Sequence, residues 1–487
     1  MSKSRTSRDF RGNFASAALL LATIGAPGVL QAAEAASESD RITALEAQLN
    51  QQKAAMEQQQ RMIEAMDAEL KRLKAGKAAA APSSTIVAAQ QAPAGAPPAK
   101  ASGQKKLSVD LYGFAQTDAI YDFKRVAPDW EDTLRVSTIP VQSGLYGNDG
   151  DFTISVRQSR LGIKGDYGED ITFKLEGELF GVGSDQGQTT LRVRHAYATY
   201  KNFLMGQTWS NFMDIDIFPN TIDYWGPTGM VFYRNRQATY TFPMGEDLVS
   251  VGLENPDTVL TVGKFWDTPN CDLPNPPPNC EATESNAADV FQSYTDLPDL
   301  AARYRNNGDF GHYQVAGIVR KLGYERLDNG NKDYEIGWGI NTSTALNTWG
   351  RDQLKLQVAY GKGIGNYMND GGVDIAPDSA DITKANAETV PLWGLSAYYD
   401  HYWSDRWSTS LGWSMTDLDT TNGQGPDEFK KGQIANINLL YYPADHVLMG
   451  TEFIWGQRED IDGSTGSDYR IQFSLKVDFD TGDFLKQ

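Results

Sequence analysis

The sequence predicts an all-β membrane protein: a 16-stranded antiparallel transmembrane β-barrel preceded by a periplasmic α-helical coiled coil. Short segments alternate apolar and polar residues from about Leu107 to Phe479. In Gln353–Tyr360, for example, every second residue is Leu, Val or Tyr, and the residues between them are mostly polar. This period of two places the apolar side chains on one face of a strand, as in a barrel that faces lipid outside and water inside. A soluble β-sandwich has the same period, so the choice between a membrane barrel and a sandwich depends on the N-terminal region of the sequence.

The N-terminus has the pattern of a secretory signal peptide, which we expect over residues 1–35. Four basic residues come first, and residues 15–30 are mostly small and apolar. Small residues at Ala33 and Ala35 suit cleavage. The alternative is a short membrane anchor, but the apolar stretch is too short and too rich in alanine to span a bilayer well. The sequence after the signal peptide contains no apolar run of 20 residues that could form a transmembrane helix. An exported chain of this kind is expected in the outer membrane of a Gram-negative bacterium.

Composition excludes some partners and leaves others open. The chain has 487 residues, a formal net charge of −19 and 11% aromatic residues, and its acidity argues against nucleic acid as a partner. Total charge says nothing about the selectivity of a pore, which local charges determine. Cys271 and Cys280 are predicted to form a disulfide in an oxidising compartment. Two cysteines without a nearby histidine make a poor metal site, and no metal or cofactor is expected.

Residues 36–75 are predicted to form a periplasmic coiled coil. Apolar residues and two glutamines repeat at alternating spacings of three and four: Ile42, Leu45, Leu49, Gln52, Met56, Gln59, Ile63, Met66, Leu70 and Leu73. This heptad pattern favours association of several copies, and we expect a homotrimer. A single amphipathic helix lying on the barrel is the alternative. Residues 76–106 are rich in Ala, Pro, Gly and Ser and predict a linker, which leaves 107–487 for the barrel.

Turn signals give the strand count. Seven short turns are predicted at 165–170, 201–202, 243–247, 306–309, 347–351, 404–405 and 443–445. Eight longer loops are predicted at 122–151, 181–188, 210–229, 255–298, 323–332, 365–390, 420–429 and 458–467. Turns and loops alternate, so they join 16 strands, and both ends of the barrel chain fall on the periplasmic side. Thr258–Phe265 also has a strand pattern, and we place it as a hairpin extension in the fourth loop.

Several strands carry basic residues on their polar face. The residues predicted to line the pore and bind solute are Arg160, Arg192, Arg194, Arg234, Arg236, Arg303, Arg305 and Lys355. Glu176 and Glu178 share the face of Lys174, whereas His195 and Tyr197 are expected on the face opposite Arg192. Arg236 shares its face with two aromatic residues, and the orientation of Arg157 depends on a bulge near it. Paired arginines do not suit a lipid-facing wall, where each costs about 2–4 kcal/mol at mid-membrane. Salt bridging at the barrel rim is the alternative.

The third predicted loop, 210–229, supplies candidate partners for these arginines. It is aromatic and carries Asp214, Asp216 and Asp223. If it folds into the barrel, its carboxylates oppose the arginines and form a narrow constriction. The alternative is an ordinary outer loop, in which case these carboxylates do not meet the arginines.

Four segments together resemble a known family: SRLGIKG, RVRHAYATY, GQTWSNFMD and YRNRQ. They resemble DcaP-like outer-membrane porins and, more distantly, the general trimeric porins. The resemblance implies a trimeric channel with a periplasmic coiled coil that favours negatively charged solutes, dicarboxylates among them. Its basic constriction corresponds here to Arg160, Arg192, Arg194 and Arg234. Many such barrels end on an aromatic residue, whereas here DTGDFLKQ follows Phe479.

An enzyme is not indicated. The sequence has no G-x-S-x-G motif, its four histidines occur singly, and a calcium-loop pattern at 417–428 has its glycine displaced. The sequence therefore predicts a passive porin for small negatively charged solutes, including (di)carboxylates. The outer-membrane lipid and lipopolysaccharide would surround it, and peptidoglycan could contact the coiled coil. The alternative is a structural protein that tethers the membrane to the cell wall through its coiled coil; it has no need for paired arginines in the lumen.

Overall fold

The computed structural model describes residues 107–261, 263, 291–327, 329–381 and 383–484. The predicted signal peptide, coiled coil and linker (1–106), and the pair Cys271 and Cys280, lie outside the described residues. Among the described residues, no helix has both the length and the apolar character needed to cross a membrane.

The described chain is almost entirely β-strand. Its strands are β1 (Leu107–Asp122), β2 (Asp151–Ser155), β3 (Arg160–Tyr167), β4 (Ile171–Phe180), β5 (Thr189–Tyr200), β6 (Phe203–Trp209), β7 (Arg234–Met244), β8 (Asp247–Glu254), β9 (Phe291–Tyr294), β10 (Asp299–Gly308), β11 (Gly311–Arg326), β12 (Asn331–Asn347), β13 (Gln353–Lys362), β14 (Ile375–Pro377), β15 (Ala387–Thr389), β16 (Pro391–Ser404), β17 (Trp407–Leu418), β18 (Phe429–Ala444), β19 (Val447–Asp460) and β20 (Thr465–Asp480). A short helix, α2 (Thr481–Phe484), follows the last strand.

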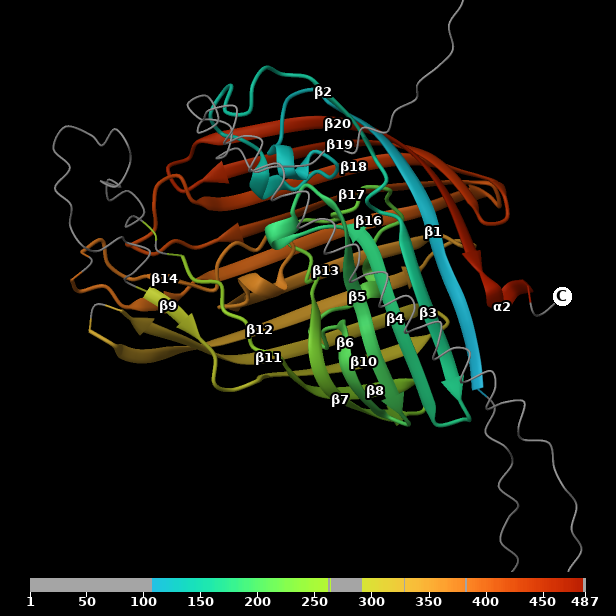
Figure 1. Cartoon of the computed structure of the whole chain (residues 1–487), viewed down its shortest axis with the longest axis horizontal. Coiled ribbons are helices and arrows are strands. Elements are labelled where there is room, and N and C mark those ends of the chain that lie inside the picture. The colour runs from blue at the N-terminus through green and yellow to red at the C-terminus, as the bar shows by residue number, and fades with distance from the viewer. Residues whose placement is uncertain (1–106, 262, 264–290, 328, 382, 485–487) are drawn as a thin grey trace, which may run out of the picture. The chain divides into compact units, whose positions relative to one another are not determined.

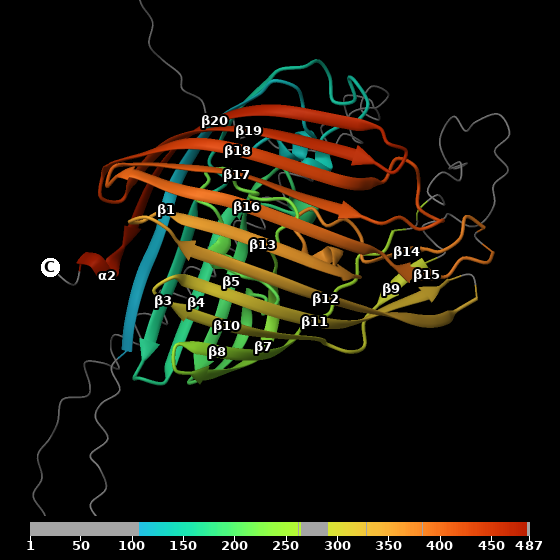
Figure 2. The same ribbon diagram turned by 180° about the vertical axis from the view of Figure 1, so that it is seen from behind.

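The strands close into a barrel (Figures 1 and 2). Each pairs antiparallel with its neighbour in the chain, and β1 pairs with β20 to complete the ring. β2 and β3 both pair with β1, and β9 and β10 both pair with β11, so each couple is one interrupted strand. β14 and β15 form a separate two-stranded sheet, and β13 pairs directly with β16. Counted in this way the wall has 16 strands, and the predicted barrel is confirmed. The interruption at 156–159 is where the sequence required a bulge, and it turns Arg157 inward.

All seven predicted short turns join strands at one end of the barrel, and the eight longer connections lie at the other. We call these the turn end and the loop end. The hairpin expected at Thr258–Phe265 is not found in the described part of that segment, which is 258–261 and 263. Leu260 instead forms an isolated β-bridge with Ile375 of β14. This bridge is possible because the sixth loop, which contains β14, folds inward and lies beside Leu260.

Strand side chains alternate as the pattern predicts. In β20, the outward residues Phe473 and Val477 are 46% exposed, whereas the inward residues Arg470 and Gln472 are 0% exposed. Because the outer face is apolar and uncovered, it suits lipid.

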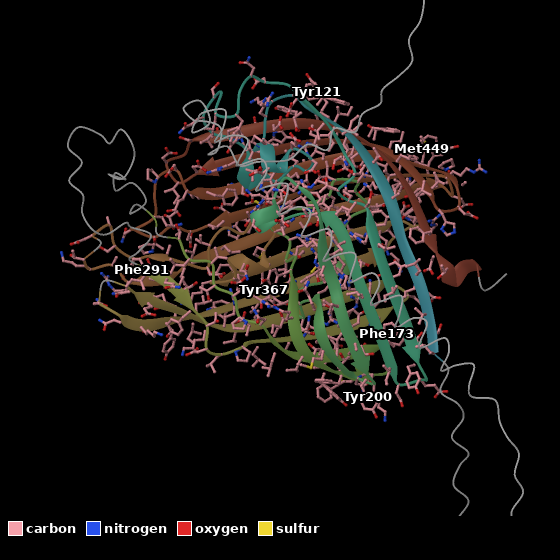
Figure 3. The ribbon with its side chains drawn as sticks, viewed as in Figure 1. Tyr121, Phe173, Tyr200, Phe291, Tyr367 and Met449 are labelled. Atoms are coloured by element: carbon pink, nitrogen blue, oxygen red, sulfur yellow. The ribbon has the colours of Figure 1, made fainter. Side chains whose placement is uncertain are left out.

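The hydrophobic core lies inside the barrel, on one side of it. Three connections fold into the lumen: L1 (123–150), L3 (210–233) and L6 (363–390). Apolar residues of L3 and L6, such as Phe212 and Tyr367, pack on small inward residues of the wall, such as Ala316 and Ala359. Figure 3 shows Tyr367 within the barrel and Tyr200 at its periphery. The packing fills the lumen beside β10–β19, and a cavity remains on the side of β5–β7.

Candidate functional site

L3 follows the inner wall and is anchored to many strands in turn. Asn211 donates to Gln237 and Thr239 of β7, and Asp214 accepts from Ser343 of β12. Further along, the backbone N–H of Ile222 donates to Glu452 of β19 at 2.8 Å. These contacts fix the loop in the lumen, because a displaced loop would leave buried polar groups of the wall unpaired.

Four arginines gather on the open side of the lumen. This arginine cluster consists of Arg160 (β3), Arg192 and Arg194 (β5) and Arg234 (β7), and it surrounds two carboxylates of β4, Glu176 and Glu178. The contacts to Glu178 are 2.5 Å from Arg192, 2.5 Å from Arg194, 3.4 Å from Arg160 and 3.8 Å from Arg234. Glu176 lies 2.9 Å from Arg194 and 3.6 Å from Arg160.

A bulge in β5 shapes this cluster. The pairing with β4 skips Arg194, so that Glu176 opposes His195 and Gly177 opposes Val193. Arg194 and His195 therefore both point inward and are buried. The prediction that His195 and Tyr197 face away from the arginines is wrong for this reason. His195 instead bonds Thr208 at 3.0 Å inside the barrel.

The cluster keeps an excess of positive charge. Four guanidinium groups face two carboxylates, and Lys174 adds a further ammonium group 3.1 Å from Glu176. Arg234 is the least neutralised of the four, since its one carboxylate contact is the longest of the cluster's contacts to Glu178. Its Nη1 is buried and has no hydrogen-bond partner among the described residues. Arg234 therefore keeps unused donor capacity beside the carboxylates of the cluster.

A second basic group lies nearer the turn end, on β10. Arg305 bonds Asp214 at 3.3 Å and Asp216 at 2.5 Å, both in L3. Nε of Arg303, which faces the same way, has no hydrogen-bond partner in the described chain. Burial acts to raise the pKa of Asp214, but hydrogen bonds from His312 and Ser343 and the charge of Arg305 outweigh it and hold that pKa below its usual value.

Asp223 does not oppose the arginine cluster. It accepts from the side chain of Thr133 and the N–H of Leu134, both in L1, and lies 3.7 Å from Arg470 of β20. Burial raises its pKa more than these contacts lower it. Asp223 therefore joins L1 and L3 to the wall.

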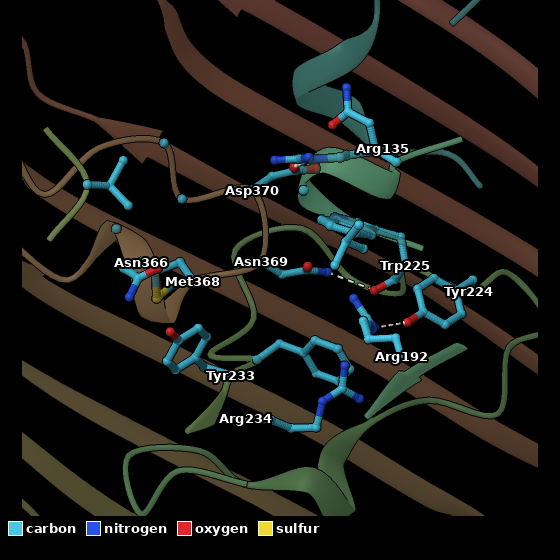
Figure 4. Close-up of a pocket in the computed structure, with 18 of the residues that line it drawn as sticks. Arg135, Arg192, Tyr224, Trp225, Tyr233, Arg234, Asn366, Met368, Asn369 and Asp370 are labelled. Atoms are coloured by element: carbon cyan, nitrogen blue, oxygen red, sulfur yellow. Dashed lines mark hydrogen bonds and ion pairs between the residues drawn. The ribbon is translucent and has the colours of Figure 1, made fainter. Parts of the chain in front are cut away.

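L1, L3, L6 and the second outer loop (181–188), together with Arg192 and Arg234 of the cluster, line a cavity of about 610 Å³ (Figure 4). Arg192 and Arg234 lie on one side of it, and the L6 residues Asn369 and Asp370 on the other. Arg135 of L1 also lines the cavity, with its Nε 2.8 Å from Asp370. This cavity is the candidate solute-binding site.

Two of the predicted pore-lining residues are placed elsewhere. Arg236 is exposed on the outer face, between Asn235 and Gln237, which are buried within. Arg234 lies two residues before Arg236 and by strand alternation should share its outward face. It is the first residue of β7, directly after L3 leaves the lumen, and its side chain reaches inside. Lys355 faces inward, but it is buried under L3 and bonds Asp400 at 2.8 Å and the carbonyl of Phe218. It anchors the loop and does not line the open lumen.

Sequence reasoning missed two parts of the site. It placed Glu176 and Glu178 on the luminal face but did not pair them with the arginines, although Glu178 directly opposes Arg160 and Arg192 in the sheet. It also missed L1 and L6, whose inward course has no periodic signal; the run of glycines at 371–372 in L6 was the available hint.

Within the described parts of the chain, one group could hold a metal ion by its geometry: Asp214, Asp216 and His312. Arg305 already pairs with both carboxylates. A cation would have to displace that guanidinium, so the group fits an ion pair better than a metal.

A closed barrel with an apolar outer face and a cavity between inward loops, lined in part by charged side chains, is the architecture of an outer-membrane channel of the porin class. The profile of the DcaP outer membrane protein family matches residues 30–258. This match covers a little under half of the chain, which is therefore similar to the DcaP outer-membrane porins, and the resemblance predicted from its motifs is confirmed.

Solved structures give the same fold. The outer membrane channel DcaP of Acinetobacter baumannii is 23% identical and superposes with a TM-score of 0.62, over 77% of this chain and 97% of that one. The anion-selective porin from Comamonas acidovorans is 11% identical with a TM-score of 0.48, over 77% of this chain and all (100%) of the other. A trimer form of OmpT from Vibrio cholerae is 11% identical with a TM-score of 0.44, over 77% and 99%. No curated protein matches the chain in sequence.

Proposed function

We propose that the channel passes small negatively charged solutes, carboxylates and dicarboxylates among them, by passive diffusion through the cavity beside the arginine cluster. The observation that carries this proposal is the excess of guanidinium groups over carboxylates, with the Nη1 of Arg234 left without an acceptor. A planar guanidinium group can hold a carboxylate through two hydrogen bonds.

The site suits transit better than tight binding. Arg192 and Arg194 already contact Glu178, which weakens their hold on a solute. A second basic position, at Arg303 on β10, offers another weak contact nearer the turn end. Several modest sites in series favour both entry and release. A dicarboxylate could bridge neighbouring cations, which favours it over a monocarboxylate.

The test compares two solutes and two variants of one strand. Malonate and malonamide have the same carbon skeleton, but only malonate is charged. In proteoliposomes, we expect malonate to enter faster, and we expect Arg234→Gln to slow malonate but not malonamide. Arg236→Gln is the matched control, because Arg236 lies two residues away on the outer face. Equal entry of both solutes, or equal effects of both variants, would contradict the proposal.

We also propose that the protein forms a homotrimer in the outer membrane, stabilised by the heptad segment. The support is the heptad pattern of residues 36–75.

A further inference from the structure

The cavity has an aromatic wall that charge selection alone does not require. Its lining includes six aromatic side chains: Trp130, Trp209, Tyr224, Trp225, Phe232 and Tyr233. They come from L1, from the end of β6 and from L3. An ion-selective passage needs only charge and water, so this gathering of rings beside the arginines points to a more specific solute.

The rings are held in place by one another. Trp130 and Trp225 are in edge-to-face contact with ring centroids 5.1 Å apart, and Trp209 lies 5.2 Å from Phe232. Tyr224 stacks on Phe180 of the wall at 3.7 Å. Because these contacts already fix the rings, a solute loses little of its binding free energy to ordering them.

Cationic groups and rings are combined in the same wall. The guanidinium carbon of Arg234 lies 5.0 Å from the ring centroid of Trp209. Arg234 and Trp225 both line the cavity. The Nη1 of Arg234 and the indole Nε1 of Trp225 are buried and have no hydrogen-bond partner among the described residues. Two unused donors beside flat apolar surfaces match a ligand with an anionic acceptor at one end and a flat ring at the other.

We propose that the cavity prefers flat aromatic carboxylates over saturated carboxylates of the same size and charge. The proposal rests on the function proposed above and adds a ring to the solute class. The carboxylate accepts from Arg234, and the ring lies against the aromatic wall formed by Trp209, Phe232 and Tyr233. Ring contacts of this kind favour the aromatic solute by about 3- to 10-fold.

The test is block of the KCl current through single channels by benzoate and by cyclohexanecarboxylate. Both carry one carboxylate on a six-carbon ring, but only benzoate is flat and aromatic. We expect half-block by benzoate at about 3- to 10-fold lower concentration. Phe232→Leu should bring the ratio of the two half-block concentrations close to one. Tyr233→Leu is a second variant if the first does not assemble. Phe242→Leu, an aromatic change on the exposed outer face of β7, is the control and should keep the wild-type ratio.

The outcomes separate the two proposals. Equal block by both acids, abolished in both cases by Arg234→Gln, overturns the aromatic preference and leaves the anion channel standing. Block by neither acid, together with malonate entry that is indifferent to Arg234, overturns both. A preference for benzoate that survives both Phe232→Leu and Tyr233→Leu also contradicts the placement of the ring.

Discussion

Glu178→Gln removes the carboxylate that all four arginines of the cluster share. Glu178 is fully buried (0% exposed) and lies between 2.5 and 3.8 Å from each guanidinium group. Glutamine has the same shape and retains an acceptor for the Tyr224 hydroxyl, which donates to Glu178. The charge excess of the cluster should therefore rise by one with little change in packing.

The size of the effect follows from Coulomb's law. A monovalent ion passing about 7 Å from the lost charge changes its energy by about 0.6 kcal/mol at the dielectric constant of water. The change has opposite sign for anions and cations, so the difference between them is about 1.2 kcal/mol, or about 8-fold in permeability ratio. A lower effective dielectric constant in the narrow cavity would enlarge this value, and salt would reduce it.

The assay is the reversal potential of reconstituted channels across a KCl gradient at low salt. Glu178→Gln should shift the permeability ratio toward anions. Glu246→Gln, the same chemical change in an exposed turn between β7 and β8, should have no effect. Because the arginines lose a shared carboxylate, heat resistance in detergent should fall, and the ratio is read on channels that still insert as open barrels. An unchanged ratio, or a shift toward cations, would refute the assignment of the ion path to the arginine cluster.

Three further predictions concern what holds the molecule together. Arg320→Gln should leave Asp374 of L6 buried without its 2.9 Å ion pair and lower the stability of the fold by about 3–5 kcal/mol. The variant should therefore resist heat less well and give a noisier single-channel current. A current as quiet as that of the wild type would show that this ion pair does not hold L6 in place. Deletion of residues 38–75 should lower the oligomer's stability in native gels, whereas an equally heat-resistant oligomer would place the contacts on the barrel. Thiol titration without reductant should find no free thiol if Cys271 and Cys280 are bridged; two reactive thiols would exclude the disulfide.

The barrel could be predicted because its rules are local. A period of two fixes which face of a strand meets lipid, and turn residues mark where each strand ends. The strand count depended only on these signals, and it was right even where strands are interrupted. The bulge near Arg157 could be predicted because the exposed apolar residues lie at even positions up to Val156 and at odd positions from Leu161. A continuous strand cannot keep both sets on one face.

The site could be predicted only in part, because loops and bulges break the period. The bulge at Arg194 turns His195 inward although its sequence parity points outward. Arg234 and Arg236 have the same parity, but only Arg234 stands where the chain leaves the lumen. The partners of the L3 carboxylates depend on the course of a loop through space, so Asp214 meets Arg305 while Asp223 meets Arg470.

The reversal potential of the wild-type channel across a tenfold KCl gradient shows whether the pore selects chloride over potassium. The proposed excess of positive charge beside the cavity predicts a potential of the sign set by chloride, and a decline in its magnitude as both salt concentrations are raised together. A potential of the sign set by potassium would contradict the proposal that the arginine cluster makes the pore selective for anions. The acidic loops of the chain could produce such a potential.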